Sequence, residues 1–502
     1  MKYDTIIGLE IHAELKTKSK MFCTCKNDSD EKQANKNVCP ICLGHPGALP
    51  YPNKKAIEDT VLIGLALNCK IHQKSKFDRK NYFYPDLPKG YQISQLDFPF
   101  SYDGHLEVND KKIQVTRIHL EEDTAKSSHP AGKNYTLVDF NRSGAPLIEM
   151  VTEPVITDSN EAKKFCQIYQ QILKYLNISD ASMEKGEMRC EANVSIQEKD
   201  KWQYLGNCEI KPVGDYKLNP KVELKNINSF KALEKAIDYE VKRQINAKEN
   251  NEELIQETRG WNDEKGKTIS QRVKETSADY RYFPDPDIPP IEISNQWIEE
   301  IRTRLVELPQ DKKTRFKEQY DLNEDAIDVL ISDKNLANFT EKTISELRAW
   351  INASGDTWER QKKKLAKSVS NWLSSELLKF LKSDNKNIDD TKITPENFAE
   401  LISLIYQDKI NSSAGQTILK VMYEKGGDPT DIMKDLGLEQ MDNNEELEKT
   451  IKEILKKNEK QVAEYKSGKE NVIQYLVGQT MAATKGKANP KKVQETLKKL
   501  LS

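Results

Sequence analysis

The sequence predicts an α+β fold: an antiparallel-sheet cradle domain, then an all-helical connector and a small helical tail domain. Segments in which apolar and polar residues alternate lie in the front of the chain, with all eight cysteines and all six histidines. From Trp297 onward apolar residues recur at helical spacing. Because 502 residues exceed one ordinary core, we predict three domains, at residues 1–292, 293–405 and 406–502.

The predicted strands of the front part carry polar side chains on one face. In residues 5–15 apolar and polar residues alternate, so Glu10 and His12 point to the same side. Residues 188–196 alternate in the same way and place Glu191 on their polar face. This pattern is typical of an antiparallel sheet with one face buried.

The helices of the front part are predicted from their caps and periodicity. Residues 160–176 form an amphipathic helix with Asp158 or Ser159 as N-cap. A strand over residues 222–230 leads into a second helix, which Ser229 caps. Helices and strands thus mix in this domain without the regular alternation of a parallel sheet.

The back part begins a fresh set of helices at Thr394, the predicted N-cap, with Pro395 at the first helical position. The end of the chain is rich in lysine: Lys485, Lys487, Lys491, Lys492, Lys498 and Lys499. Such a run is typical either of a contact with a nucleic-acid backbone or of the solvated face of a terminal helix.

Composition excludes several classes of protein. The formal charge is −2, from 78 basic and 80 acidic residues, so the chain is not a polycationic nucleic-acid binder, although local basic patches remain open. It has no apolar run of 18 residues, and we expect no membrane span. We see no secretion or transit signal and expect the protein to be cytoplasmic.

Acidic residues mark three segments of the front part, two of which also contain a histidine. Glu10 lies beside His12, a second cluster runs from His119 to Asp123, and Glu149 stands in an apolar context. Oxygen ligands with one imidazole suit a hard cation such as Mg²⁺. A solvated strand face is the alternative for any one segment, but three such segments favour a metal site.

Four cysteines are clustered in sequence, as Cys23, Cys25, Cys39 and Cys42. In a reducing compartment four thiolates at this spacing predict a tetrahedral structural zinc site in preference to disulfides. Four unconnected reduced thiols are the alternative.

Several basic residues are candidates for binding anions. Residues 76–95 interleave aromatic residues with Arg79 and Lys80, which suits base stacking and phosphate neutralisation, or a loop that packs on the sheet. Arg142 lies in a polar turn before Glu149 and suits a phosphate or a carboxylate, or simply the surface. The chain has no Gly-x-Gly-x-x-Gly, P-loop or Gly-x-Ser-x-Gly motif.

Taken together, these segments resemble the B-subunit family of the aspartyl/glutamyl-tRNA(Asn/Gln) amidotransferases, in the bacterial type that forms a heterotrimer. The resemblance covers essentially the whole chain, and the cysteine cluster resembles that of the zinc-bearing members. It rests on five long, ordered segments: Gly8–His12, Phe77–Gln95, His119–Asp123, Asp139–Glu149 and Asp279–Asp287.

The resemblance implies a ligase that uses ATP and Mg²⁺ to phosphorylate the side-chain carboxylate of misacylated Glu-tRNA(Gln) or Asp-tRNA(Asn). Ammonia then displaces the phosphate; a separate amidase-type A subunit makes it from glutamine, and a small C subunit stabilises the pair. The tail domain is implied to contact tRNA. The alternative is a non-catalytic tRNA-binding scaffold within the same complex.

The resemblance also implies roles for particular residues. His12, Glu122 and Glu149 are expected to bind Mg²⁺, with Glu10 and Glu191 as partners of a second, substrate-linked ion. Glu10 is also expected to be a catalytic residue. The other expected catalytic residues are contacts for phosphate or the acyl carboxylate, namely Arg79, Lys80 and Arg142.

Overall fold

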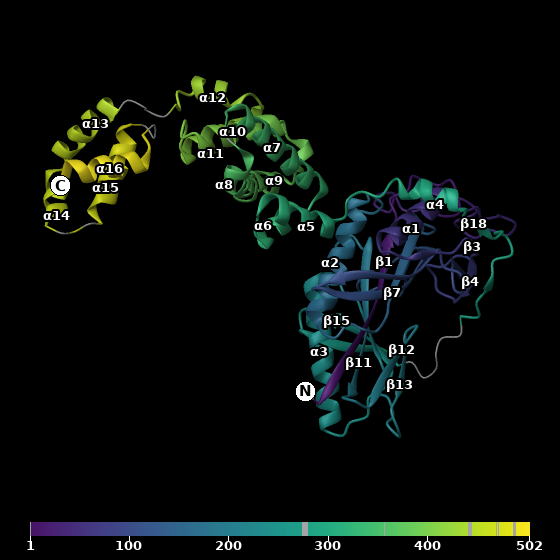
Figure 1. Cartoon of the computed structure of the whole chain (residues 1–502). Helices are drawn as coiled ribbons and strands as arrows, with labels where there is room; N and C mark the ends of the chain where they lie inside the picture. The colour runs from purple at the N-terminus through teal and green to yellow at the C-terminus, as the bar shows by residue number, and fades with distance from the viewer. Residues whose placement is uncertain are drawn as a thin grey trace. The chain divides into compact units, whose positions relative to one another are not determined.

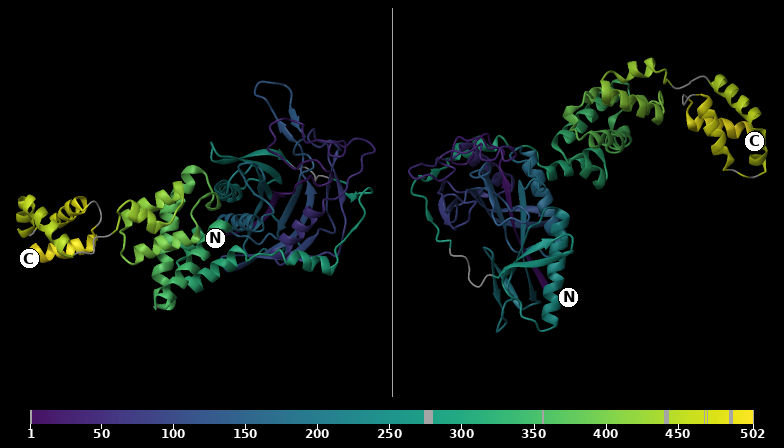
Figure 2. Two further views of the ribbon diagram at one scale, coloured as in Figure 1. Left: turned by 90° about the horizontal axis from the view of Figure 1, so that it is seen from above. Right: turned by 180° about the vertical axis from the view of Figure 1, so that it is seen from behind.

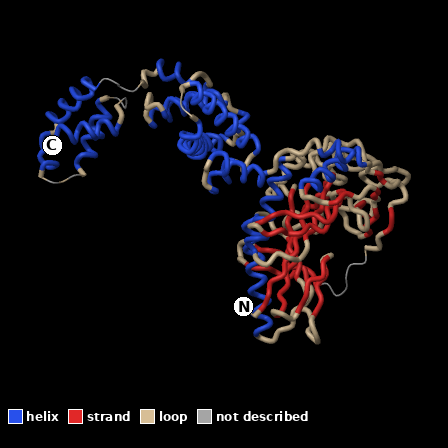
Figure 3. The backbone as a smooth tube through the Cα atoms, in the orientation of Figure 1, coloured by secondary structure: helices blue, strands red, loops and turns tan. Residues whose placement is uncertain are grey.

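The computed structural model describes residues 2–273, 280–355, 357–439, 444–467, 469, 471–484 and 488–501. Asp279, Lys485 and Lys487 therefore lie outside the described residues. The chain forms two compact units, one ending at Pro309 and the other beginning at Gln310. Strands, red in Figure 3, lie in the first unit, whereas the described part of the second unit is helical.

A large sheet organises the first unit. Within the described residues nine strands join in the order β16-β15-β14-β11-β1-β10-β7-β6-β2; β14 and β15 run parallel and the other neighbours antiparallel. Their bounds are β1 Tyr3–Glu14, β2 Lys70–Ile71, β6 Ser101–Val108, β7 Lys111–Glu122, β10 Pro146–Thr152, β11 Met188–Glu198, β14 Val222–Lys225, β15 Glu257–Asn262 and β16 Lys267–Val273.

Short strands pair outside this sheet, as β17-β4-β5, β18-β3, β8-β9 and β12-β13. They are β3 Lys74–Ser75, β4 Asp78–Asn81, β5 Tyr91–Ser94, β8 Lys126–Ser128, β9 Leu137–Asp139, β12 Trp202–Gly206, β13 Glu209–Pro212, β17 Phe283–Pro284 and β18 Ile291–Glu292. The pairing of β17 with β4 brings residues 283–284 beside residues 78–79.

Helices cover one face of the large sheet. Figures 1 and 2 show α2 and α3 lying along one side of the strands. Ile7, Leu9 and Ile11 of β1 are at most 1% exposed in the core on this side, and each such side chain contributes about 1.5–3 kcal/mol to stability. The helices of the unit are α1 Lys54–Ala66, α2 Ser159–Tyr175, α3 Phe230–Glu249 and α4 Asn295–Arg302.

The predicted caps are confirmed. The Asp158 side chain accepts from the Glu161 amide at the start of α2, and Ser229 accepts from Ala232 at the start of α3. In the second unit Thr394 caps α10. Each cap satisfies an amide that the helix itself leaves without a partner, which contributes about 1 kcal/mol.

The second unit has two apolar clusters, formed by residues 316–433 and 447–501. Its helices are α5 Pro309–Tyr320, α6 Glu324–Leu330, α7 Lys334–Ala353, α8 Trp358–Asn371, η1 Trp372–Leu377, α9 Leu378–Asp384, η2 Ile388–Asp390, α10 Pro395–Tyr406, α11 Ser412–Lys425, α12 Pro429–Asp435, α13 Asn444–Lys457, α14 Glu459–Lys466, α15 Val472–Ala483 and α16 Pro490–Leu501.

The α+β class is confirmed, with a mainly antiparallel sheet followed by helices. The division into three domains at residues 292 and 405 stays a prediction. Helix α4 follows residue 292, and its Ile301 packs in the core of the first unit. No helix in the described ranges has the length and apolar character needed to cross a membrane.

Candidate active site

The polar face of the sheet carries a pocket of about 560 Å³. Strand register builds its floor: His12 on β1 lies opposite Glu149 on β10, which lies opposite His119 on β7. On the other side of β1, Glu10 lies opposite Glu191 and His12 opposite Arg189. Residues that are paired across antiparallel strands point to the same face, so four strands contribute to one site.

Both signs of charge line this pocket. Its carboxylates are Glu10, Asp86, Glu121, Asp123, Glu149, Glu191 and Glu223. Its cations are Lys80, Arg117, Arg189, Lys221 and Lys225. A face with this composition suits a ligand that carries phosphates together with cations.

A compact group of carboxylates and imidazoles occupies the middle of the floor. His12 Nε2 lies 3.3 Å from Glu149 Oε2 and 3.8 Å from oxygens of Glu10 and Glu121. His119 Nε2 lies 3.3 Å from Glu149 Oε2 and 3.6 Å from Glu121 Oε2. The donor atoms of Glu10, His12 and Glu149 lie within 4.8 Å of one another, as do those of His119, Glu121 and Glu149.

Burial and the charges within this group shift the pKa values of its members. Burial disfavours the imidazolium, but the hydrogen bond to Glu149 and the charges of Glu149, Glu10 and Glu121 prevail and raise the pKa of His12 to about 9. Burial likewise disfavours the Glu149 carboxylate, yet His119 and His12 hold its pKa well below the usual range. The pKa of Glu10 is raised, by burial and by the charge of Glu149. A cation among these carboxylates would relieve the same repulsion.

Glu122, one of the predicted Mg²⁺ ligands, lies outside this group, and its neighbour Glu121 lies within it. The side chain of Glu122 forms an ion pair with Lys89 and accepts from the Ile93 amide at 3.0 Å. The reason is the two-residue period of β7, which places Glu121 on the same face as His119 and Glu122 on the opposite face. His119 and Glu121, which could hold a metal ion with Glu149, were not among the predicted site residues, although the alternation from Arg117 to Glu121 is visible in the sequence.

The predicted pair of Glu10 and Glu191 is brought together, with Glu223 as a third member. Lys225 Nζ lies 2.8 Å from Glu191 and 3.3 Å from Glu223. Neither Glu223 nor Lys225 was predicted as a site residue. Both come from the short strand β14, whose position next to β11 only the sheet order reveals.

The three predicted anion-binding cations have different positions. Lys80 lines the pocket, where the carboxylates of Glu121 and Glu149 outweigh the effect of burial and raise its pKa. Arg79 points elsewhere, with Nε 2.8 Å from Asp285 and Nη2 2.8 Å from Asp287. Adjacent strand residues face opposite sides, so Arg79 is not among the residues that line the pocket, and its role as an anion contact stays a prediction.

Arg142 lies beside the pocket and not among its lining residues. Its guanidinium donates to the carbonyl oxygens of Thr124 and Ala125, both at 3.0 Å, and lies 3.5 Å from Asp123 Oδ2. Arg189 approaches the same Asp123 oxygen at 2.6 Å. Arg142 therefore helps to position Asp123, a carboxylate that lines the pocket.

Some buried donors of the site lack a partner. Among the described residues Arg117 Nε, Arg189 Nε and His119 Nδ1 are buried and make no hydrogen bond. Leaving a buried charged donor unsatisfied costs free energy. Because all three residues line the pocket, their free donors indicate that an anionic or acceptor-rich ligand completes it.

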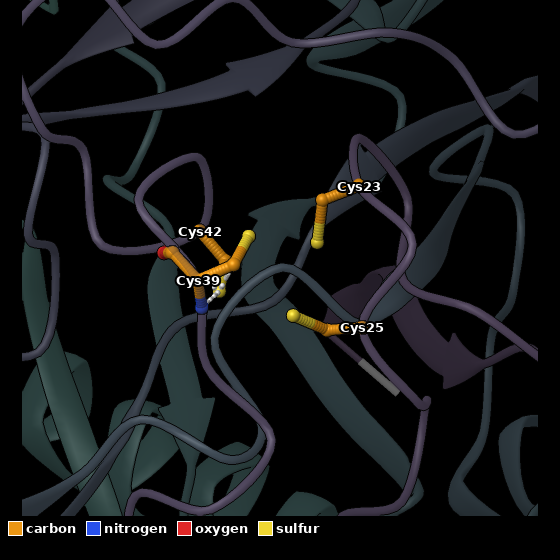
Figure 4. Close-up of side chains that lie close together, drawn as sticks. All are labelled: Cys23, Cys25, Cys39 and Cys42. Carbon is orange, nitrogen blue, oxygen red and sulfur yellow. Dashed lines mark hydrogen bonds between the residues drawn. The ribbon is translucent and has the colours of Figure 1, made fainter.

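The four clustered cysteines meet in space. Figure 4 shows the side chains of Cys23, Cys25, Cys39 and Cys42 pointing toward one another, and their sulfurs lie within 4.8 Å of one another. All four are free thiols. The hydrogen bond from Cys23, followed by the effects of Lys20 and Cys39, lowers the pKa of Cys42 to about 5. Four sulfurs at these separations match the ligand set of a tetrahedral zinc site.

Comparison with known proteins covers both units. The GatB/GatE catalytic domain matches residues 5–299, and the GatB domain matches residues 356–501. The whole chain is similar to proteins named as the B subunit of aspartyl/glutamyl-tRNA(Asn/Gln) amidotransferase. That of Thermoanaerobacter pseudethanolicus is 44% identical over 506 positions and that of Thermodesulfovibrio yellowstonii 43% identical, each over 100% of both chains. The Thermotoga petrophila protein is 42% identical over 100% of this chain and 99% of its own.

Proposed function

The chain belongs to the B-subunit family of the aspartyl/glutamyl-tRNA(Asn/Gln) amidotransferases, and on this premise we propose that its pocket carries out an ATP- and Mg²⁺-dependent activation of misacylated tRNA. The γ-phosphoryl group of ATP is transferred to the side-chain carboxylate of Glu-tRNA(Gln) or Asp-tRNA(Asn), leaving ADP and an acyl phosphate. Ammonia attacks the acyl carbon and inorganic phosphate leaves, which gives the amide.

The observation that carries this proposal is that one pocket is lined both by two arginines with a buried, unpaired Nε and by a group of carboxylates. Arg117 Nε and Arg189 Nε have no partner among the described residues, and the charge of Lys80 acts on Glu121 and Glu149. A triphosphate supplies the acceptors that these donors lack. Phosphoryl transfer needs mainly positioning and charge neutralisation, which such a site provides without a side-chain nucleophile.

The donor atoms fit a hard divalent cation. Glu10, His12 and Glu149, or His119, Glu121 and Glu149, would hold one ion, and Glu10, Glu191 and Glu223 a second. When bound, such cations neutralise phosphate charge. Lys80 and Arg117 remain to orient the anionic substrate, and Arg189 also holds Asp123 in place.

The partners follow from what this reaction requires. Activation by ATP requires a source of ammonia, and the sequence shows no serine or cysteine nucleophile with an evident partner that would release it from glutamine. We propose that an amidase-type A subunit makes ammonia from glutamine and passes it through a channel, that a small C subunit stabilises the pair, and that the helical tail contacts tRNA. The complex works in the cytoplasm, where its tRNA substrates are.

The cysteine cluster is proposed to bind one structural zinc ion. Cys23, Cys25, Cys39 and Cys42 would fill a tetrahedral coordination sphere, which leaves no open position for catalysis. Zinc would cross-link the stretch of Cys23 and Cys25 to that of Cys39 and Cys42, both of which lie between β1 and α1. Its role is then stability of the first unit.

The experiment that tests the proposed reaction uses the chain assembled with its A and C partners. The complex receives ATP, Mg²⁺, ammonium and Glu-tRNA(Gln) without glutamine, and both ADP and Gln-tRNA(Gln) are measured. We expect both products, and Glu121→Gln to remove both while tRNA still binds.

Two results would contradict this proposal. A complex that binds tRNA but forms neither ADP nor amide from Glu-tRNA(Gln) and from Asp-tRNA(Asn) would favour the scaffold function. ADP formation that Glu121→Gln leaves unchanged would place the phosphoryl transfer outside this pocket.

A further inference from the structure

Lys20 is a buried lysine beside the cysteine cluster. It is 0% exposed, and its Nζ donates to the carbonyl oxygens of Asn37 at 2.7 Å and Phe140 at 3.1 Å. Its third neighbour is Cys42 Sγ at 3.8 Å. Lysine is almost never fully buried unless it is paired, because removing the ammonium from water is costly.

Among the described residues the partners of Lys20 Nζ are these two carbonyl oxygens and the Cys42 sulfur, with no carboxylate in an ion pair with it. Two carbonyl dipoles satisfy its hydrogen bonds but do not balance its charge. Four thiolates around a Zn²⁺ ion carry a net charge of −2, and the nearest of these sulfurs would belong to Cys42. A zinc-bound cluster would therefore supply the negative charge that the buried ammonium lacks, and the ammonium would offset part of the charge of the cluster.

We propose that Lys20 is the counter-ion of the zinc-bound cysteine cluster, and that it ties this cluster to the loop of residues 139–145. The inference rests on the zinc site proposed above and is independent of the reaction. Lys20 is in this view a positioning residue, because it reaches the pocket only through that loop.

The loop is joined to the cysteine segment at several further points. The Met21 amide donates to Gly144 O at 2.7 Å, and the Asn37 amide donates to Asn141 Oδ1 at 2.8 Å. Gly144 has a φ of +83°, and a Cβ there would lie 3.5 Å from the Cβ of Cys42. That distance is an ordinary contact, so it is the left-handed backbone that favours glycine at this position.

The loop in turn supports the pocket. Arg142 fixes the carbonyl oxygens of Thr124 and Ala125, and its guanidinium lies 3.5 Å from Asp123. Asp123 lines the pocket and forms an ion pair with Arg189. Ordering of the cysteine cluster by zinc is therefore transmitted through Lys20, Phe140 and Arg142 to a carboxylate of the active site.

The test compares zinc affinity across matched variants of the purified chain, measured by competition with a chromophoric chelator. Lys20→Met keeps much of the volume and removes the charge, Lys20→Arg keeps the charge, and Lys18→Met is an exposed control two residues away. Residues that support metal ligands typically contribute a factor of about 10–100 in affinity. We expect such a loss for Lys20→Met, a much smaller one for Lys20→Arg and none for Lys18→Met.

A second measurement does not depend on the folding of any variant. Hydrogen exchange of residues 139–145 is followed in the wild-type chain with zinc and after zinc removal, and we expect these amides to lose protection without zinc. Unchanged protection, or a Lys20→Met variant that binds zinc as the wild type does, would overturn the role of Lys20. Wild-type protein that binds no zinc would instead overturn the zinc site itself.

Discussion

His12 Nε2 lies 3.3 Å from Glu149 Oε2 because β1 and β10 are antiparallel neighbours in a register that sets these two residues opposite each other. His119 continues the same row from β7 and approaches the same oxygen of Glu149. One carboxylate is thus shared by two imidazoles from different strands. This arrangement explains why Glu149 is held ionised in a buried position, and why the choice of ligands depends on strand register.

The first prediction concerns Glu121 and Glu122, which are adjacent in sequence but face opposite sides of β7. Glu121→Gln removes a pocket carboxylate, and we expect ADP formation by the complex to fall by roughly a hundredfold or more. Glu122→Gln removes the charge of a buried carboxylate that pairs with the half-buried Lys89, and it should destabilise the first unit by about 1–3 kcal/mol, with a smaller loss of activity. Single-turnover ADP formation and urea denaturation measure the two effects. A large loss of ADP formation in Glu122→Gln, with little loss in Glu121→Gln, would instead favour Glu122 as the metal ligand.

The second prediction concerns Lys225, whose ammonium lies between Glu191 and Glu223. It competes with a cation for these carboxylates, so Lys225→Met should tighten Mn²⁺ binding, by roughly tenfold. Lys221→Met, which removes another pocket lysine, is the control. Mn²⁺ titration followed by electron paramagnetic resonance gives both affinities, and an unchanged affinity in Lys225→Met would contradict the competition.

The third prediction concerns pH and Glu14. Burial and the charge of Asp123 raise the pKa of Glu14 to about 7, above its ordinary 4.5. The folded chain therefore binds this proton more tightly than the unfolded chain, and stability falls as pH rises from about 4.5 through 7. Glu14→Gln should stabilise the protein by about 1–3 kcal/mol at pH 8 and have little effect at pH 4.5. Urea denaturation at both pH values measures the free energy of unfolding. An equal effect of Glu14→Gln at both would contradict a raised pKa of Glu14 in the folded protein.

The fourth prediction concerns Arg79, which holds the fully buried Asp285. Arg79→Met leaves that carboxylate without its cation and should cost about 3–5 kcal/mol, whereas Arg79→Lys should cost less. Denaturant unfolding of both variants checks the order. An Arg79→Met variant of wild-type stability with a raised KM for ATP would instead make Arg79 a phosphate contact.

The fifth prediction concerns zinc. Elemental analysis should find one zinc per chain, and either chelation or Cys39→Ser should lower the thermal midpoint of the first unit, because the irregular segment around residues 20–42 loses its cross-link. Cys208→Ser, which changes an exposed thiol, is the matched control. Purified protein that contains no zinc, or a Cys39→Ser variant that melts at the wild-type temperature, would refute the site.

The sequence by itself determined what local patterns encode. Alternation gave the polar face of β1, the caps Asp158, Ser229 and Thr394 placed the starts of three helices, and the spacing of the cysteines grouped them correctly. These features depend on neighbours a few residues apart, whose geometry is set by the backbone period and by unpaired amides at helix ends.

Only the tertiary structure decided which groups from distant segments meet. The order of the strands put Glu223 and Lys225 of β14 beside Glu191. The pairing of β17 with β4 gave Arg79 its partner Asp285, and the loop at Phe140 received the ammonium of Lys20. Such contacts depend on register and on the packing of the whole domain, in which a shift of one residue turns a side chain to the other face.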